Sequence, residues 1–411
     1  MTGSDPVHNT LVCLLAGGSG ERLYPLTRDR AKPAVPFGGI YRIVDLTLSN
    51  CINSDLRRIF VLTQYKSLSL NRHIRDGWNI FPGELGEFIH ILPPMMRTGE
   101  HWYRGTADAI YQNLYSVGSE PYEYILILAA DHVYKMDYRL MITQHGNSGA
   151  DLTVGVIEYD KSEAARFGVC ELDQDNRIIG WEEKPVKPKP SPHNPGKCLI
   201  SMGIYCFSRE FLVRILKEDA EDPESSHDFG RDLLPKIISS CRVFAFNFVD
   251  ENRKESLYWR DIGTIDAYYE ANMDLVSVSP IFNLYDDRWP IRTYQRQYPP
   301  AKFVFSEERR RGIALDSIVS MGSIISGGCV ERSVLSHAVR VESCAHIENS
   351  IVFPHSTIGS NARIRNAIIE RQVDIPTNAQ IGFNLEEDRK KYYVTDSGIV
   401  VVVPGIRTFE T

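Results

Sequence analysis

The stretch LLAGGSGERLYPLTRDRAKP, residues 14–33, places three glycines and several basic side chains directly after an apolar run. This order predicts a buried strand that ends in a tight turn. Two standard phosphate loops do not fit it. A Walker A loop needs Gly-Lys-Ser/Thr at its end, and a dinucleotide fingerprint that begins at Gly18 needs Gly or Ala where the chain has Leu23.

The turn remains open to two interpretations. Glycine serves equally well in a plain strand-to-helix turn, because it tolerates a positive φ. Backbone N–H groups free of side chains, at a helix N-terminus and beside Arg22 and Lys32, instead form an anion site. The basic residues favour the second interpretation.

Composition and charge restrict the class of protein. The chain has 411 residues, of which 43% are hydrophobic and 24% charged, and a net charge of -7. These values predict a globular chain of two domains with no nucleic-acid partner, because no basic stripe is present. No apolar run approaches the ~20 residues of a membrane span, and the polar start predicts no export signal. Eight scattered cysteines without Cys-x-x-Cys predict reduced thiols in the cytoplasm.

Residues 1–275 alternate strand-like and helix-like segments, which predicts an α/β fold: a Rossmann-like, mostly parallel sheet with helices on both faces. We expect this segment to be the catalytic domain and residues 276–305, rich in Pro and aromatics, to be a linker packed on both sides. The expected strands are Leu11–Leu15, Ile59–Thr63, Tyr124–Ala129, Leu152–Ile157 and Ser201–Phe207.

Residues 306–411 show a different pattern, in which apolar side chains recur every 17 residues in three series. A hexapeptide-type parallel β-helix explains this period, because each coil buries its apolar positions against the coils above and below. A β-sandwich with coincidental spacing is the alternative. The series are Ile318, Leu335, Val352 and Ile369; Ile324, Val341, Ile358 and Ile375; and Val330, Ile347, Ile364 and Ile381.

Chemistry is therefore expected in the first domain, beyond the carboxyl ends of its strands. Asp131 ends the buried run YILILAADHVY, and Asp261 lies between an arginine and a glycine turn in YWRDIGT. Asp131 could simply cap a helix, but two carboxylates near a triphosphate would hold Mg²⁺. Lys184, before Pro185, would be held extended and directed at a second phosphate, although such a lysine is most often solvated.

Several motifs together resemble the bacterial glucose-1-phosphate adenylyltransferases, a family of sugar nucleotidyltransferases. They are LAGGSGERL with AKP, WYRGTADA, LAADHVY, EEKP, SMGIYCF, SSHDFGRDLLPK and YWRDIGT, followed by WPIRTY and PPAKFV. The resemblance covers nearly the whole chain. It implies that ATP and glucose 1-phosphate give ADP-glucose and pyrophosphate, the activating step of bacterial glycogen synthesis, in a homotetramer whose C-terminal domain is a left-handed β-helix for oligomerisation and regulation.

The same resemblance implies a role for each matching residue. Arg22, Lys32 and Asp131 would be catalytic, and Asp131 and Asp261 would share Mg²⁺. The nucleotide would contact Leu15, Ala16, Gly17, Gly18, Gln64, Tyr103, Gly105 and Thr106. The sugar phosphate would contact Tyr103, Gly168, Glu183, Lys184, Ser201, Tyr205, Asp228, Phe229 and Trp259.

Regulation is where the chain departs from part of this family. Relatives activated by fructose 1,6-bisphosphate carry a lysine at the position of Asp29, a basic residue at Ile40 and a histidine at Pro36. We therefore expect weak activation or none by that bisphosphate, and control by another phosphorylated metabolite or inorganic phosphate. The expected anion site, between the two domains, comprises Arg28, Arg30, Arg42, Arg389 and Lys390.

Two other functions stay open. A nucleotidyltransferase that uses UTP or dTTP would share most of these motifs. A catalytically inactive regulatory subunit would keep the fold and lose the carboxylates, and the presence of Asp131, Asp261, Arg22 and Lys184 argues against it.

Overall fold

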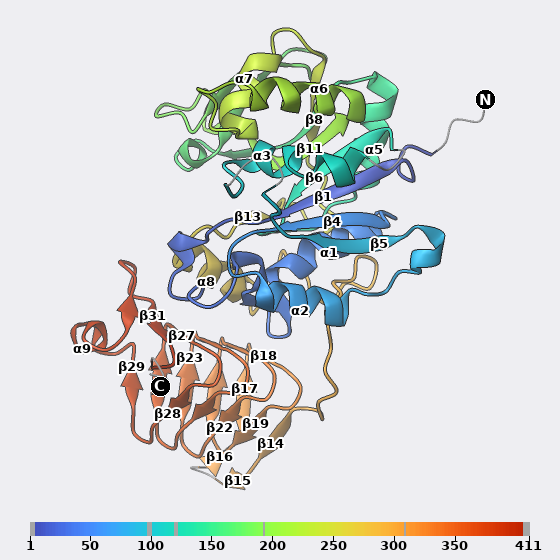
Figure 1. The fold of residues 1–411 in the computed structure, drawn as a ribbon. Helices are drawn as coiled ribbons and strands as arrows, with labels where there is room; N and C mark the ends of the chain where they lie inside the picture. Colours follow the sequence, from blue (N-terminus) through green and yellow to red (C-terminus); the bar gives the residue numbers. More distant parts are fainter. Residues whose placement is uncertain (1–4, 97–100, 119–121, 192–193, 308–309, 406–411) are drawn as a thin grey trace.

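The chain forms an α/β part and a stack of coils, joined by a long irregular segment (Figure 1). The computed structural model describes residues 5–96, 101–118, 122–191, 194–307 and 310–405. The α/β part is built on a nine-stranded sheet. Its strands are β1 (Thr10–Ala16), β4 (Arg58–Thr63), β5 (Phe88–Leu92), β6 (Tyr124–Ala129), β8 (Leu152–Asp160), β9 (Gly168–Leu172), β10 (Ile178–Glu183), β11 (Lys197–Ser208) and β12 (Val243–Asn247).

The centre of this sheet is parallel. Strand β1 pairs in parallel with β4 and β6, and β4 pairs in parallel with β5. Strand β11 is antiparallel to β6 and β8 and adds the sheet's other half. The predicted parallel-dominated α/β fold is therefore confirmed, and all five expected strands are present. These central strands are continuous apolar runs because helices cover both of their faces.

Alternate residues of β1 point to opposite faces of the sheet. Val12, Leu14 and Ala16 belong to the core under α1, α2 and α5, whereas Leu11 and Cys13 belong to the core under α3, α4, α6 and α7. The helices are α1 (Ile43–Asn53), α2 (Leu68–Gly77), α3 (Thr106–Tyr111), α4 (Leu114–Gly118), α5 (Tyr138–Ser148), α6 (Arg209–Ala220), α7 (Leu234–Ile237) and α8 (Ile265–Asp274). No helix in the described ranges has both the length and the apolar composition of a membrane span.

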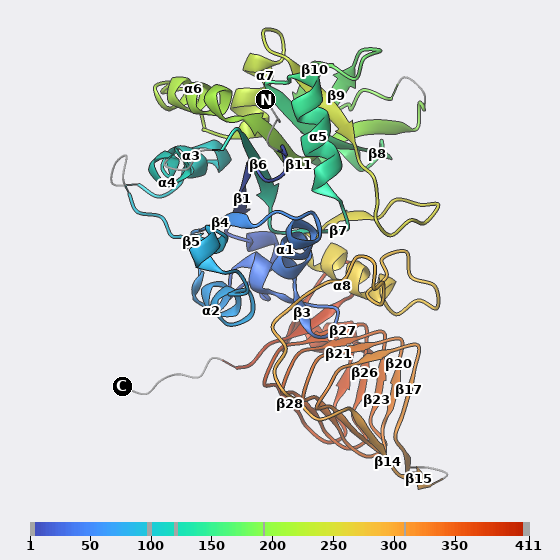
Figure 2. The same cartoon turned by 90° about the vertical axis from the view of Figure 1, so that its right-hand side faces the viewer.

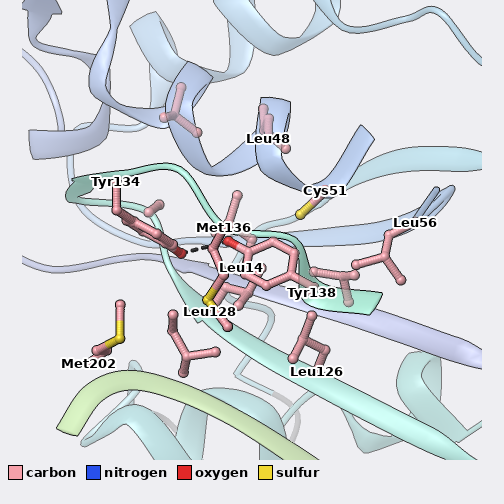
Figure 3. Close-up of a cluster of buried hydrophobic side chains, with 14 of the residues drawn as sticks. Leu14, Leu48, Cys51, Leu56, Leu126, Leu128, Tyr134, Met136, Tyr138 and Met202 are labelled. Carbon is pink, nitrogen blue, oxygen red and sulfur yellow. Dashed lines mark hydrogen bonds between the residues drawn. The ribbon is translucent and has the colours of Figure 1, made fainter. Parts of the chain in front are cut away.

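The core beneath α1 contains two tyrosines that keep their hydroxyl groups paired (Figure 3). The Tyr134 and Tyr138 hydroxyl oxygens lie 2.6 Å apart in a hydrogen bond, and both side chains are fully buried. Leu14, Leu128 and Met136 surround them. Since a buried hydroxyl without a partner costs ~1–3 kcal/mol, this pairing lets the core enclose both rings.

The coil stack is a parallel β-helix with three sheets (Figure 2). One sheet contains β14 (Lys302–Val304), β19 (Ile324–Ser326), β22 (Arg340–Val341), β25 (Thr357–Ile358) and β28 (Asp374–Ile375). The second contains β17 (Ile313–Leu315), β20 (Cys329–Glu331), β23 (His346–Glu348), β26 (Arg363–Arg365) and β29 (Gln380–Ile381). The third contains β18 (Ile318–Val319), β21 (Val334–Leu335), β24 (Ile351–Val352), β27 (Ala367–Ile369), β31 (Val400–Val402) and β30 (Tyr393–Val394).

Two of the predicted 17-residue series are wrong at their first member. Val319, not Ile318, pairs with Leu335, and Ile325, not Ile324, pairs with Val341. The first coil is one residue shorter, because only four residues separate Ile325 from Val330. Burial agrees with this register, since Ile325 is fully buried and Ile324 is not.

The α/β part and the β-helix share a core. Tyr268 of the α/β part and Phe282 of the connecting segment pack in one cluster with Val334, Ile351 and Phe353 of the β-helix. The connecting segment contacts both sides through hydrogen bonds and ring stacking. Its contacts are Trp289 Nε1 to Asn50 Oδ1 at 2.8 Å, Thr293 Oγ1 to Asp45 Oδ2 at 2.6 Å, and Tyr298 stacked on His337 with ring centroids 4.8 Å apart.

Candidate active site

The glycine loop follows β1 at the carboxyl end of the parallel strands. A Cβ added to Gly18 would meet no atom within 4 Å, so the loop presents bare backbone on that side. Within the described chain, the N–H groups of Gly18 and Ser19 donate to no protein acceptor. Backbone donors of this kind are available to an anion.

The loop does not begin an α-helix, so the expected helix N-terminus is wrong. It enters a single 3₁₀ turn, Glu21–Leu23, and the next α-helix begins only at Ile43. Gly20 has φ +66°, and its carbonyl accepts a hydrogen bond from Thr27 Oγ1 at 2.8 Å. The chain thus turns back through Thr27 instead of continuing as a helix, and the macrodipole of a long helix does not contribute here.

Lys32 joins the two predicted metal ligands. Its Nζ lies 2.8 Å from Asp131 Oδ2 and 3.3 Å from Asp261 Oδ1, and its side chain is 10% exposed. The structure therefore brings together three residues separated by up to 229 positions in the sequence. Two carboxylate oxygens thus contact the same ammonium group, and carboxylate oxygens are ligands that a divalent cation such as Mg²⁺ prefers.

The charges of this cluster stabilise one another. Burial opposes ionisation of Asp131, but the Lys32 ammonium and then His132 outweigh it and lower the pKa of Asp131 to about 2. Burial likewise acts to lower the pKa of Lys32, and the two carboxylates more than compensate and raise it. At neutral pH Asp131 is thus ionised beside a lysinium.

A two-stranded ribbon, β7 (His132–Tyr134) with β13 (Trp259–Asp261), holds the carboxylates in register. Asp261 is paired with His132, the residue after Asp131. His132 Nε2 lies 3.6 Å from Asp131 Oδ1 and 4.0 Å from Asp261 Oδ1. Sequence analysis missed His132, although its place within LAADHVY, beside Asp131, was a signal that could have identified it.

Arg22 lies at the exposed edge of the same cluster. A Cβ at Gly263 would come within 3.3 Å of an Arg22 nitrogen and 3.0 Å of Asp261 Oδ2. Because Gly263 has no side chain, the Arg22 and Asp261 side chains can both approach its Cα closely. The arginine is exposed, as a residue that contacts a bound polyphosphate must be.

A cavity of about 670 Å³ adjoins the glycine loop and Asp131. This volume is in the range typical of small-ligand sites. Of the eight residues predicted for the nucleotide, it is lined by Leu15, Gly17, Gly18, Gln64, Tyr103, Gly105 and Thr106. Ala16 is buried in the core instead. The sequence did not point to Ser19, Glu21, Tyr65, Lys66 and Arg104, which also line it.

One wall of the cavity is formed by two motifs that are far apart in sequence. A Cβ at Gly105 would lie 2.2 Å from the carbonyl oxygen of His227, so only glycine permits this approach. Thr106 Oγ1 donates to Asp228 Oδ2 at 3.0 Å and accepts from the Phe229 N–H at 3.1 Å. These hydrogen bonds hold the WYRGTADA and SSHDFG motifs against each other.

Most of the predicted sugar-side residues form a second group beside Asp228. The Glu183 carboxylate lies between two glycines, because a Cβ at Gly168 or Gly230 would come within 2.9 or 2.6 Å of its Oε2. Burial raises the pKa of Tyr205, against a hydrogen bond with Ser201, and the charges of Asp228 and Glu183 add to the rise. These polar groups therefore lie close enough to influence one another.

Three predicted sugar-side residues are placed differently from the expectation. Lys184 has φ +47° and is not extended, and its Nζ pairs with Glu183 Oε1 at 2.8 Å while its side chain is 64% exposed. Phe229 and Trp259 are buried core residues, with 1% and 4% exposure. Among the described residues, Trp259 Nε1 and His132 Nδ1 are buried without a hydrogen-bond partner, so the site has unused polar atoms.

A second cavity, of about 280 Å³, lies between the α/β part and the β-helix. Of the predicted anion-site residues, it is lined by Arg30 and Arg42 only. Arg28 bonds the Pro404 carbonyl and Asp29, and Arg389 and Lys390 lie at α9 (Leu385–Arg389), outside the lining. The five residues predicted for one anion site therefore do not line this cavity together. Sequence analysis missed Arg72, Arg296 and Arg371, which also line the cavity.

This cavity has an excess of positive charge. Burial lowers the pKa of Arg42 to about 10, Asp45 opposes the shift, and Arg30, Arg371 and Arg296 add to it. Arg30 is held by Glu370 through two hydrogen bonds, of 2.5 and 3.0 Å. The remaining arginines face the cavity with few carboxylates to balance them, which favours an anion.

Comparison with known proteins agrees with this geometry. The family described as Nucleotidyl transferase matches residues 11–278, and the family described as GlmU-like, C-terminal hexapeptide matches residues 299–402. A glucose-1-phosphate adenylyltransferase of Koribacter versatilis is 60% identical over 403 residues, which cover 98% of this chain and 97% of the relative. Similar enzymes of Rhodopirellula baltica and Methylococcus capsulatus are 54% and 52% identical, over 98% and 96% of this chain and 91% and 93% of theirs. The chain therefore belongs to the nucleotidyl transferase family and, within it, to the glucose-1-phosphate adenylyltransferases.

Proposed function

We propose that this protein transfers the adenylyl group of ATP to glucose 1-phosphate, giving ADP-glucose and pyrophosphate for α-glucan synthesis. One observation carries the proposal: Lys32, Asp131 and Asp261 converge where a glycine loop opens onto a cavity of about 670 Å³. The names of the relatives supply the substrates.

In the proposed reaction, a phosphate oxygen of the sugar attacks the α-phosphorus of ATP, and pyrophosphate leaves from the opposite side. The attacking oxygen is already ionised at neutral pH, so no general base is required. The barrier is then mainly electrostatic, because two anions must meet. Lys32 and Arg22 supply positive charge, and the Gly18 and Ser19 N–H groups donate to the nucleotide phosphates.

Mg²⁺ is the proposed cofactor, and the donor set fits it. Asp131 Oδ2 and Asp261 Oδ1 both lie within 3.3 Å of Lys32 Nζ, so two carboxylates are available beside the nucleotide cavity as oxygen ligands. An ion held by one or two carboxylates and substrate phosphates is the usual Mg²⁺ arrangement. When bound, Mg²⁺ would supply further positive charge to the phosphates, while Lys32 keeps Asp131 ionised and contacts both carboxylates.

The sugar phosphate is proposed to bind beside Asp228, where Glu183, Ser201 and Tyr205 gather. Lys184 is the candidate for its phosphate, because its ammonium is exposed and, among the described residues, pairs only with the neighbouring Glu183 carboxylate. Gly168 leaves room for Glu183, and Phe229 and Trp259 would support this wall from the core.

Turnover of a nucleotide panel tests the proposal. Purified protein with Mg²⁺ and glucose 1-phosphate should release pyrophosphate far faster with ATP than with UTP or dTTP. Asp131→Asn and Asp261→Asn should each lower kcat at least ~100-fold without unfolding the chain. A preference for UTP or dTTP would establish the alternative nucleotidyltransferase, and no turnover with any nucleotide would establish an inactive subunit.

The arginine-lined cavity is the proposed effector site, with Arg30, Arg42, Arg72, Arg296 and Arg371 as its basic residues. Asp29 is exposed and paired with Arg28 at 2.9 Å, so a carboxylate remains near this region. Fructose 1,6-bisphosphate should activate weakly, and inorganic phosphate or another phosphorylated metabolite should act more strongly. Strong activation of the unmodified enzyme at micromolar bisphosphate would refute this, whereas a gain of sensitivity in Asp29→Lys would support it.

A homotetramer and a cytoplasmic location complete the proposal. The β-helix supports assembly, because its terminal coils expose strand edges. Light scattering should give four times the 46.7 kDa chain mass. Five cysteines, at positions 13, 51, 170, 198 and 206, are buried free thiols, which is in keeping with a reducing compartment. Localisation of a tagged chain in cells tests this part.

A further inference from the structure

The outer face of the second β-helix sheet carries a cysteine, a glutamate and a histidine side by side. Cys329 and Glu331 flank the buried Val330 on β20, so both point outward. His346 is the direct ladder partner of Cys329 on β23, one coil further along. Figure 2 places these strands on the flank of the coil stack. None of the three lines the nucleotide cavity or the arginine-lined cavity.

The three side chains offer one ligand atom each, and these atoms all lie within 4.8 Å of one another. Cys329 Sγ donates to Glu331 Oε1 at 3.4 Å. In a tetrahedral site with metal–ligand distances of ~2.0–2.3 Å, neighbouring ligand atoms are about 3.5 Å apart. Rotation of side chains by about 1 Å would therefore bring all three to bonding distance of one ion, without movement of the backbone.

The neighbouring charges leave the cluster accessible to a cation. Arg332 lies 3.8 Å from Glu331 Oε2, the oxygen that the cluster does not use, and pairs with Glu348. Arg363, the next residue along the ladder from His346, places its guanidinium over the ring of Phe383 at 4.7 Å. The half-buried imidazole of His346 offers a ring nitrogen to the cluster.

We propose that Cys329, Glu331 and His346 form a binding site for a divalent transition metal, Zn²⁺ foremost, with water as the fourth ligand. A thiolate and a carboxylate together balance the charge of the ion. A sulfur and an imidazole nitrogen select Zn²⁺ or Co²⁺ over Mg²⁺ or Ca²⁺, which prefer oxygen. The ion would join two successive coils of the β-helix, through the second and third strands of this sheet.

Cobalt reports directly on such a site. Full-length reduced protein, freed of metal with a chelator, should bind one Co²⁺ with a thiolate-to-cobalt charge-transfer band, and Zn²⁺ should displace it because it binds more tightly. Cobalt at Asp131 and Asp261 would have oxygen ligands and give no such band, so the two sites are distinguishable. Zn²⁺ should also raise the unfolding temperature.

Matched variants assign the ligands. Cys329→Ser should abolish the charge-transfer band, and His346→Gln and Glu331→Gln should each weaken Co²⁺ binding at least ~10-fold. Cys344→Ser, which removes an exposed cysteine of the same β-helix, should leave the band unchanged. Pyrophosphate release at wild-type rates would establish that each variant is folded. The absence of a thiolate band in the wild type, or its persistence in Cys329→Ser, would overturn the proposal.

Discussion

Gly105 should be the least replaceable residue of the nucleotide cavity. A Cβ there would lie 2.2 Å from the His227 carbonyl oxygen, about 1 Å closer than van der Waals contact allows. Gly105→Ala must therefore separate the two motifs and break three hydrogen bonds of 2.9–3.1 Å that join Thr106 and Ala107 to residues 227–229. At ~0.5–1.5 kcal/mol each, their loss costs roughly 1.5–4.5 kcal/mol.

The assay combines thermal unfolding with kinetics. An unfolding entropy of ~2.1 cal/mol/K per residue over 411 residues converts this cost into a fall in Tm of roughly 2–5 °C. Because the separated motifs line the cavity, KM for ATP should rise at least ~10-fold. Gly83→Ala is the control, since a Cβ there meets no atom within 4 Å. A Gly105→Ala protein with wild-type Tm and KM would refute the reasoning.

Three further predictions follow from ion pairs. Lys184→Ala should raise KM for glucose 1-phosphate ~10-fold or more with little change in kcat, because a lysine that holds non-reacting charge binds ground and transition states alike; a raised KM for ATP alone would reverse its role. The pKa of Asp131 is depressed to about 2, so its pairing with Lys32 stabilises the fold fully above about pH 4 and progressively less as the pH falls toward about 2. The difference in urea midpoint between wild type and Lys32→Met should therefore shrink below pH 4. A difference that stays constant with pH would contradict this. Glu370→Gln should destabilise the protein by ~3 kcal/mol, since it leaves the buried Arg30 charge without its partner; an unchanged unfolding midpoint would show that the pair is dispensable.

Short-range patterns predicted much of the fold. Buried parallel strands are continuous apolar runs, so Leu11–Leu15 and Tyr124–Ala129 were recognisable without a structure. A coil repeat leaves a period in the sequence, and 17 residues was correct for most coils. The register of the first coil was predicted wrongly, because the loss of one residue in a Gly-rich turn changes the register without changing the composition.

The residues of the site were predicted less completely than the fold. A motif identifies residues that lie close together along the chain, and it carries no record of what folds against it. Nothing in YWRDIGT or AKP indicates that Lys32 lies 2.8 Å from Asp131. The arginine-lined cavity is a stronger case, because Arg42, Arg72, Arg296 and Arg371 come from separate segments and no motif groups them.

The sequence by itself thus determined the central strands of the core and the presence of a β-helix, and it pointed to Asp131 and Asp261, because these depend on local composition, periodicity and motifs. Only the tertiary structure decided the rest: that the glycine loop enters a 3₁₀ turn, that Lys184 has a positive φ, and that Arg389 and Lys390 lie outside the basic cavity. Each of these depends on contacts between segments distant in sequence, and such contacts are set by how whole elements pack.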